Sequence, residues 1–112
     1  MSEQRKHIRY RTIARVRLPG VFEEDALLKD LNVTGCKIEA TVCIELTEGV
    51  VYAIEVLPEA ISKISKFEVH GEARWIRTNG DSYEAGFMIT ASPAKKEFQR
   101  YVDYLAWRSS AV

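Results

Sequence analysis

Residues 29–39 read KDLNVTGCKIE, and this stretch decides the fold because it predicts two strands joined by one short turn. Polar residues occupy alternate positions at Asp30, Asn32 and Thr34, Gly35 follows, and apolar residues lie between them. Asn, Asp and Gly are common in turns because they adopt conformations that other residues avoid. Three interpretations are possible: a calcium loop, a glycosylation sequon, or a polar ledge that contacts a ligand between two strands.

The first two interpretations fail on context. An EF-hand loop starting at Asp30 would need a bidentate glutamate at its twelfth position, where Thr41 stands, and helices on both sides, where strands are predicted. Asn32-Val33-Thr34 matches a sequon, but the N-terminus MSEQRKHIRYR has no apolar segment typical of a secretory signal. We therefore expect a cytoplasmic protein with reduced cysteines, and the ligand ledge is the interpretation that remains.

The rest of the 112-residue chain predicts one mainly β domain. Period-two alternation or β-branched apolar runs indicate strands within residues 12–18, 22–32, 35–42, 49–57, 66–77 and 82–90, and 58–66 are expected to form a loop or short helical turn. Asn79-Gly80 predicts a tight hairpin turn between the last two strands. Six strands with these turn signals predict a small six-stranded antiparallel β-barrel.

The C-terminal segment changes to a helical period. Ser92 is a candidate N-cap and Pro93 a candidate first helical residue, which predicts a helix over about 93–108. An apolar stripe at i, i+3, i+4 and i+7 follows: Phe98, Tyr101, Val102 and Leu105. We expect this stripe to pack on the barrel rather than bind a partner. Trp75 and Trp107 are expected in the core or in helix packing.

The charge is neutral overall but unevenly distributed. Residues 1–18 carry a net charge of +5 and the remaining 94 residues a net charge of −5. This asymmetry predicts a flexible basic arm, residues 1–11, ahead of a barrel and helix in residues 12–112. A cationic arm on a mildly acidic body suggests either an anionic partner near the arm or a solubilising tail.

Signatures of catalysis and of membrane insertion are missing from the sequence. The two histidines, His7 and His70, lie far apart with no neighbouring nucleophile or metal-ligand set, and there is no glycine-rich phosphate loop. No apolar run approaches the length of a membrane helix. We therefore expect a binding protein without enzymatic activity, metal or membrane insertion.

Two weak motifs become specific in combination. Arg5 and Arg9 form R-x-x-x-R before the first predicted strand, and Asp30 to Gly35 read D-x-N-x-x-G in the turn. With the later segments GEARW (71–75) and YEAGF (83–87) and the C-terminal helix, the chain from about Arg5 to Trp107 resembles the PilZ domain, a bacterial receptor for cyclic di-GMP. Asn32 replaces the serine of that family's pattern, and Ala73 stands at its usual valine position.

The resemblance implies a receptor for cyclic di-GMP that orders its arm on binding and signals to motility or surface-polysaccharide machinery through a protein partner. The expected ligand-binding residues are Arg5, Arg9, Asp30, Asn32 and Gly35, with Lys6, His7 and Arg74 as possible additional contacts. Gly35 is expected to supply a positive φ or a close approach of the backbone to the ligand. No other cofactor is implied.

Two alternatives stay open. A PilZ-like adaptor could have lost nucleotide binding and act only through protein contacts, for which Asn32 is the one favourable feature. A barrel for single-stranded nucleic acid would need a basic groove with exposed aromatic residues, which an acidic body does not favour. We expect no nucleic-acid polymer as a partner, and the sequence leaves ligand stoichiometry and oligomeric state open.

Overall fold

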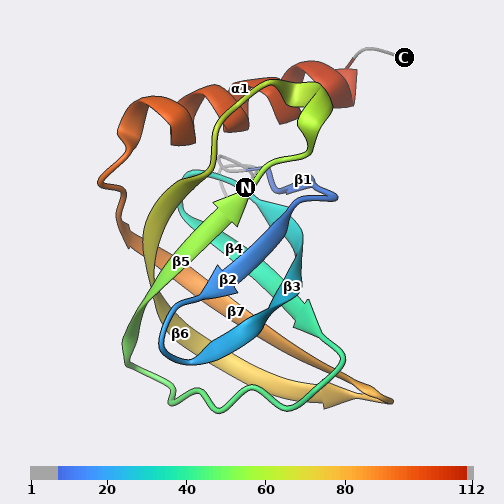
Figure 1. Cartoon of the computed structure of the whole chain (residues 1–112), viewed down its shortest axis with the longest axis vertical. Coiled ribbons are helices and arrows are strands. Elements are labelled where there is room, and N and C mark those ends of the chain that lie inside the picture. Colours follow the sequence, from blue (N-terminus) through green and yellow to red (C-terminus); the bar gives the residue numbers. More distant parts are fainter. Residues whose placement is uncertain (1–7, 111–112) are drawn as a thin grey trace, which may run out of the picture.

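The computed structural model of the protein describes residues 8–110, which form a closed β-barrel with one helix across an end (Figure 1). Six strands make the barrel: β2 (Arg15–Leu18), β3 (Phe22–Leu31), β4 (Gly35–Ala40), β5 (Val51–Leu57), β6 (Phe67–Asn79) and β7 (Ser82–Ala91). They follow the order β3-β2-β5-β6-β7-β4, and pairing of β3 with β4 closes the ring. All the pairings are antiparallel, so the predicted fold class is confirmed.

A short extra strand, β1 (Tyr10–Arg11), lies on the outer edge of β3, where Tyr10 pairs with Leu31 and Arg11 with Asp30. The sequence predicted one strand over 12–18, whereas in the structure that strand, β2, begins only at Arg15, and the additional strand β1 precedes the predicted segment. The Thr12 hydroxyl causes the interruption, because it donates to the Leu28 carbonyl at 2.8 Å and accepts from the Ala14 amide at 2.9 Å. Such local side-chain bonds compete with ladder pairing.

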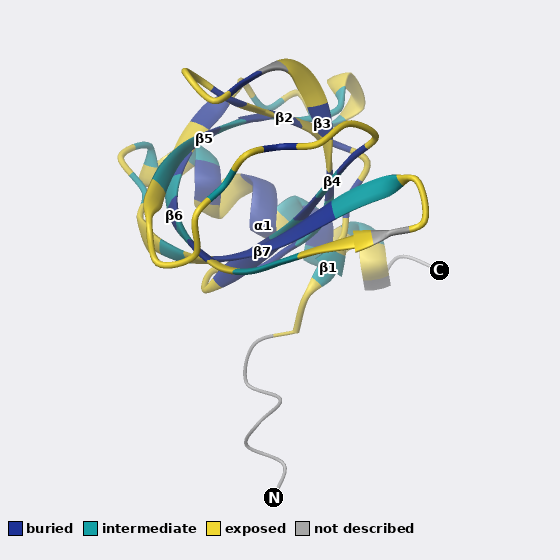
Figure 2. Ribbon diagram, turned by 90° about the horizontal axis from the view of Figure 1, so that it is seen from below, coloured by how far each residue is buried: buried dark blue, intermediate teal, exposed yellow. Residues whose placement is uncertain are grey.

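The barrel interior is filled by one apolar cluster that the alternation of the strands produces. Val16 and Leu18 of β2 are buried and the alternating Arg15 and Arg17 are exposed, which is the expected pattern for a strand with one wet face (Figure 2). Leu28, Leu31, Ile38, Ile54 and Val69 are among the fully buried side chains. A 3₁₀ turn, η2 (Ala60–Ser62), occupies the segment for which a loop or helical turn was predicted.

The helix α1 (Lys95–Ser110) covers one end of the barrel (Figure 1). Its predicted stripe is buried against the core, with Tyr101 and Leu105 at 0% exposure. The helix begins two residues later than predicted, because the first helical hydrogen bond runs from the Phe98 amide to the Ala94 carbonyl. Pro93 lies in a turn instead, since its fixed φ suits a turn as well as a first helical residue.

The expectation for Trp107 is wrong. Its side chain is 65% exposed because it lies on the helix face turned away from the barrel, and its ring lies 6.2 Å from that of Tyr104 between centroids. The hairpin turn also differs slightly, since Asn79 pairs with Ser82 and the two-residue loop is Gly80-Asp81. Positive φ occurs at Gly80, as a loop with glycine in its first central position requires.

Candidate ligand-binding site

The turn between β3 and β4 is shaped by the Asn32 side chain. Its Oδ1 accepts hydrogen bonds from the Thr34 amide at 2.9 Å, the Thr34 hydroxyl at 3.0 Å and the Gly35 amide at 2.8 Å. Asn32 is only 4% exposed, and its backbone N–H donates to the Gly35 carbonyl at 3.0 Å. Asn32 therefore builds the turn that presents the ledge, while a direct ligand contact by Asn32 stays a prediction.

A β-bulge just before this turn exposes two adjacent charged residues. Leu28 pairs with Ile38 and Asp30 with Lys37, so Lys29 is an extra residue on β3. Leu28 and Leu31 on either side are fully buried, whereas the Lys29 and Asp30 side chains are 40% and 18% exposed. A bulge re-aims side chains in this way, and here it turns Asp30 towards the outer surface.

Arg9 and Asp30 meet at this surface. The Arg9 Nη1 atom donates to Asp30 Oδ1 at 3.1 Å, and β1 holds the segment after Arg9 against β3. The structure thus joins one member of each predicted motif, separated by 21 residues in the chain. The carboxylate orients the guanidinium, whose side chain stays 46% exposed and available to a ligand.

Gly35 makes room for this arrangement. A Cβ at Gly35 would lie 2.9 Å from the Phe87 carbonyl oxygen and 3.0 Å from Arg9 Nη2, so a side chain would push Arg9 away. The expectation of a positive φ at Gly35 is wrong, because positive φ among the described glycines occurs at Gly20, Gly49 and Gly80. The glycine is needed for close approach, and what approaches it within the protein is the Arg9 guanidinium.

A hollow of about 290 Å³ opens beside Arg9, lined by Arg9, Thr34, Arg74, Trp75, Gly86, Phe87 and Met88. Arg74 enters it through a second bulge, since Ala73 pairs with Phe87 and Trp75 with Gly86, which makes Arg74 the extra residue of β6. Its Nη1 lies 3.2 Å from the Met88 sulfur. The structure therefore brings the predicted additional contact Arg74 to the same hollow as Arg9.

Trp75 is a site residue that the sequence reasoning missed. Its indole lies directly against Gly86, where no Cβ would fit, and the Arg77 guanidinium is 4.8 Å from its ring centroid. The side chain is half-buried and lines the hollow, instead of filling the core as expected. The sequence analysis included Gly86 in the YEAGF segment. The packing of the Trp75 indole on Gly86 depends on the pairing of β6 with β7, which the sequence did not show.

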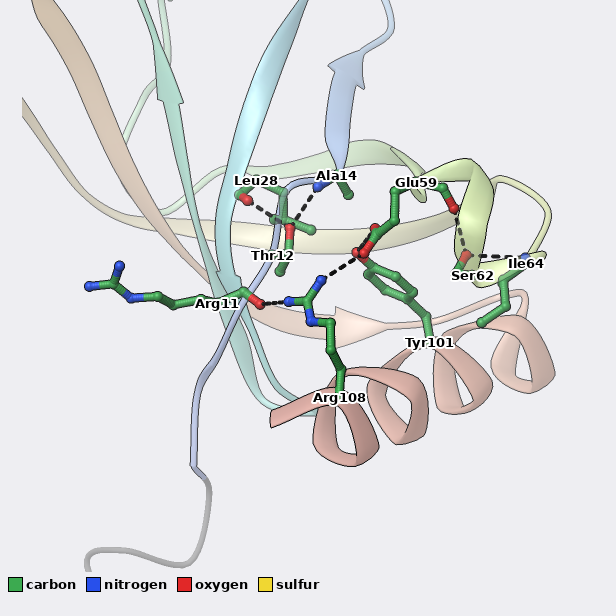
Figure 3. A network of polar contacts seen from close by, with 9 residues as sticks. All are labelled: Arg11, Thr12, Ala14, Leu28, Glu59, Ser62, Ile64, Tyr101 and Arg108. Carbon is green, nitrogen blue, oxygen red and sulfur yellow. Dashed lines mark hydrogen bonds and ion pairs between the residues drawn. The ribbon is translucent and has the colours of Figure 1, made fainter. Parts of the chain in front are cut away.

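A hydrogen-bonded group ties the arm's last residues to α1 (Figure 3). Glu59 accepts from the Tyr101 hydroxyl at 2.6 Å and from Arg108 Nη1 at 2.9 Å, and Arg108 Nη2 donates to the Arg11 carbonyl. Burial, and then the contact with Glu59, raises the pKa of Tyr101 far above its usual range, so this hydroxyl stays a donor. We call Glu59, Tyr101 and Arg108 the anchor.

Several predictions fall outside these contacts. Arg5, Lys6 and His7 lie outside the described residues, so their predicted roles stay predictions. Within residues 8–110 no group of three or more His, Cys, Asp or Glu could hold a metal ion. No helix in that range is long and apolar enough to cross a membrane. A larger hollow of about 600 Å³ between β2, β3 and the loop after β5 contains none of the predicted ligand residues.

Comparison with known proteins identifies the fold. No protein-family model and no curated protein matches the sequence. Among solved structures, the inhibitor of motility MotI/DgrA from Bacillus subtilis superposes with a TM-score of 0.77 at 15% identity over 96% of this chain. The PilZ domain with c-di-GMP of YcgR from Escherichia coli superposes with a TM-score of 0.67 at 18% identity, also over 96% of this chain.

The chain has the fold of a PilZ domain, and the resemblance inferred from the motifs is confirmed at that level. It covers 95% of the YcgR domain but only 51% of the MotI/DgrA chain, so it spans about half the length of the latter. At these identities the likeness concerns the fold, and the chemistry has to be argued from this chain's own residues.

Proposed function

We propose that this domain is a receptor for cyclic di-GMP and acts by binding, without catalysis. The observation that carries the proposal is the 3.1 Å pair between Arg9 and Asp30, set over Gly35 beside a hollow with a second arginine. It joins both halves of the sequence pattern on a PilZ-like barrel. The YcgR domain of the same fold is described with c-di-GMP, which supports the same ligand here.

The chemistry of the ligand fits these side chains. Cyclic di-GMP is a dianion with two guanine bases, and an arginine fork can bind a phosphate, pair with guanine O6 and N7, or stack on a base. Arg9, oriented by Asp30, and Arg74 face one hollow and supply two such forks. Asp30 accepts hydrogen bonds only, so it serves the ligand either by holding Arg9 or by accepting from a guanine N–H edge.

The small size of the hollow supports a role for the arm in covering the ligand. Ligand pockets usually measure about 300–1,000 Å³, and this one, at about 290 Å³, lies at the lower end. A dinucleotide seated there would extend beyond its rim. Arg5 and its cationic neighbours precede Arg9 directly in the sequence, so we infer that the arm folds over the exposed part of the ligand and neutralises it. We propose that this ordering of the arm is the conformational change that signals ligand binding.

The signal would pass to a protein partner in motility or surface-polysaccharide machinery. The naming of MotI/DgrA as an inhibitor of motility supports the motility branch. The alternative is an adaptor of the same fold that no longer binds nucleotide. Asn32 is its supporting feature, although the structural use of Asn32 in the turn offers another reason for its presence.

Calorimetric titration of the whole chain with cyclic di-GMP tests the proposal, with GTP and cyclic AMP as ligand controls. We expect micromolar or tighter binding of cyclic di-GMP alone. Arg9→Ala and Asp30→Ala should each weaken it about ten- to a hundredfold, because a lost bidentate contact costs about 1–3 kcal/mol.

Arg100→Ala is the matched control for Arg9→Ala, since Arg100 is exposed on α1 away from the hollow and its removal changes the net charge by the same amount. If the wild-type chain gives no heat with cyclic di-GMP at high concentration, the receptor proposal is wrong and the adaptor interpretation takes its place. Equal loss in the Arg100 variant would show that only overall charge matters and would remove the site from the proposal.

A further inference from the structure

A second cationic hollow lies across Asp30 from the first. It measures about 200 Å³ and is lined by Arg11, Thr12, Lys29, Asp30 and Lys37. None of its three cations belongs to the motifs that the sequence analysis used. Asp30 lines this hollow and Arg9 lines the first one, so the Arg9–Asp30 pair connects the two hollows.

Strand register places two of these cations, Arg11 and Lys37, in line with the first hollow. Arg11 pairs with Asp30, Asp30 with Lys37, Lys37 with Gly86 and Gly86 with Trp75, so one row crosses β1, β3, β4, β7 and β6. Directly paired residues project to the same side of a sheet, and neighbouring strands are about 4.8 Å apart. Lys37 therefore lies one strand from Asp30 and one strand from Gly86, which lines the first hollow.

The charges of this hollow are only partly compensated. Lys29 forms an ion pair with Glu39 at 3.2 Å, and Asp30 is already used by Arg9 at 3.1 Å. The side chains of Arg11 and Lys37 form no hydrogen bond or ion pair with another residue in the described range 8–110. Arg11, Lys29 and Lys37, together with Arg9, outnumber the two carboxylates beside them, Asp30 and Glu39, which leaves a local positive surplus on a body that is acidic overall.

The position of Arg11 is fixed by the anchor. Arg108 holds the Arg11 carbonyl, and β1 pairing holds its backbone against Asp30. Figure 3 shows the Arg11 side chain extending away from α1, on the opposite side of its backbone from Arg108. The Arg11 guanidinium is thus attached to an ordered backbone. Ligand binding at Arg11 therefore does not have to include the entropic cost of ordering this backbone.

We propose that Arg11 and Lys37, supported by Lys29, form a second anion subsite that receives the other phosphodiester of the same cyclic di-GMP molecule. One dinucleotide then lies across Asp30, with one half in each hollow. This inference rests on the proposed function and deepens it, because it predicts a single ligand that spans five strands and a recognition surface wider than the two motifs.

The test is titration of the whole chain with cyclic di-GMP at low and high salt, in wild type and in an Arg11→Gln/Lys37→Gln double variant. Glutamine keeps much of the side-chain length and polarity and removes only the charge. We expect the double variant to bind about five- to tenfold more weakly at low salt, as the loss of two exposed charge contacts implies. Its affinity should also depend less on salt, because screening acts on the charges that were removed.

Lys95→Gln/Arg100→Gln is the matched control, since it removes the same net charge from the exposed surface of α1. Wild-type affinity in this control, together with weaker binding in the Arg11/Lys37 variant, supports the subsite. Unchanged affinity and unchanged salt dependence in the Arg11/Lys37 variant would overturn it and leave the receptor proposal intact. If wild type does not bind cyclic di-GMP at all, both proposals fall together.

Discussion

The anchor and the ledge both combine arginine with a carboxylate, yet they differ in how completely the charges are matched. In the anchor, the Glu59 side chain is 9% exposed and receives both Tyr101 and Arg108, so every partner is internal. On the outer surface that we call the ledge, two carboxylates, Asp30 and Glu39, lie among four cations whose side chains reach solvent: Arg9, Arg11, Lys29 and Lys37. The difference separates charges that hold the fold from charges left for a ligand.

Removal of the Glu59 carboxylate should give the largest effect on stability. Glu59→Ala leaves the Tyr101 hydroxyl and the Arg108 guanidinium without their shared acceptor, and the hydroxyl is on a fully buried residue. We expect the free energy of unfolding to fall by about 2–3 kcal/mol. Urea unfolding followed by circular dichroism measures it. Glu48→Ala, at an exposed loop position, is the control, and equal losses in the two variants would contradict the role of the anchor.

Loss of the Tyr101 hydroxyl alone should have a smaller effect of the same kind. Tyr101→Phe keeps the ring packed against Phe67 and removes the hydrogen bond to Glu59, while Glu59 retains Arg108. We expect a loss of about 1 kcal/mol in the free energy of unfolding. Because the raised pKa of Tyr101 keeps its hydroxyl protonated, the loss should be the same at neutral and mildly alkaline pH. A loss that disappears at mildly alkaline pH would argue against this hydrogen bond.

Charge removal on the ledge should have the smallest effect on stability. Lys37→Gln takes away a cation that forms no ion pair within the described residues and that lies near other cations. We expect the free energy of unfolding to stay within about 0.5 kcal/mol of wild type. The same unfolding measurement decides the matter. A loss comparable to that of Tyr101→Phe would mean that Lys37 is structural, and the distinction between ledge and anchor would not hold there.

The sequence by itself determined the periodic parts of this protein. Alternation placed the six barrel strands, and the i, i+3, i+4, i+7 stripe placed the buried face of α1, because both depend on local geometry repeated along the chain. The sequence also pointed to the turn at Asp30–Gly35. The charged pair in L-K-D-L interrupts the alternation of β3, and this was the signal of the bulge at Lys29 that the strand prediction passed over.

Only the tertiary structure decided which distant residues meet. Arg74 reaches the hollow of Arg9 because a bulge in β6 and the closure of β3 on β4 bring these strands to one face. Arg108 holds the Arg11 carbonyl across 97 residues, and Trp107 is exposed because the apolar stripe fixes the rotation of α1. Strand register and the meeting of distant strands depend on the packing of the whole barrel, so no short window of the sequence contains them.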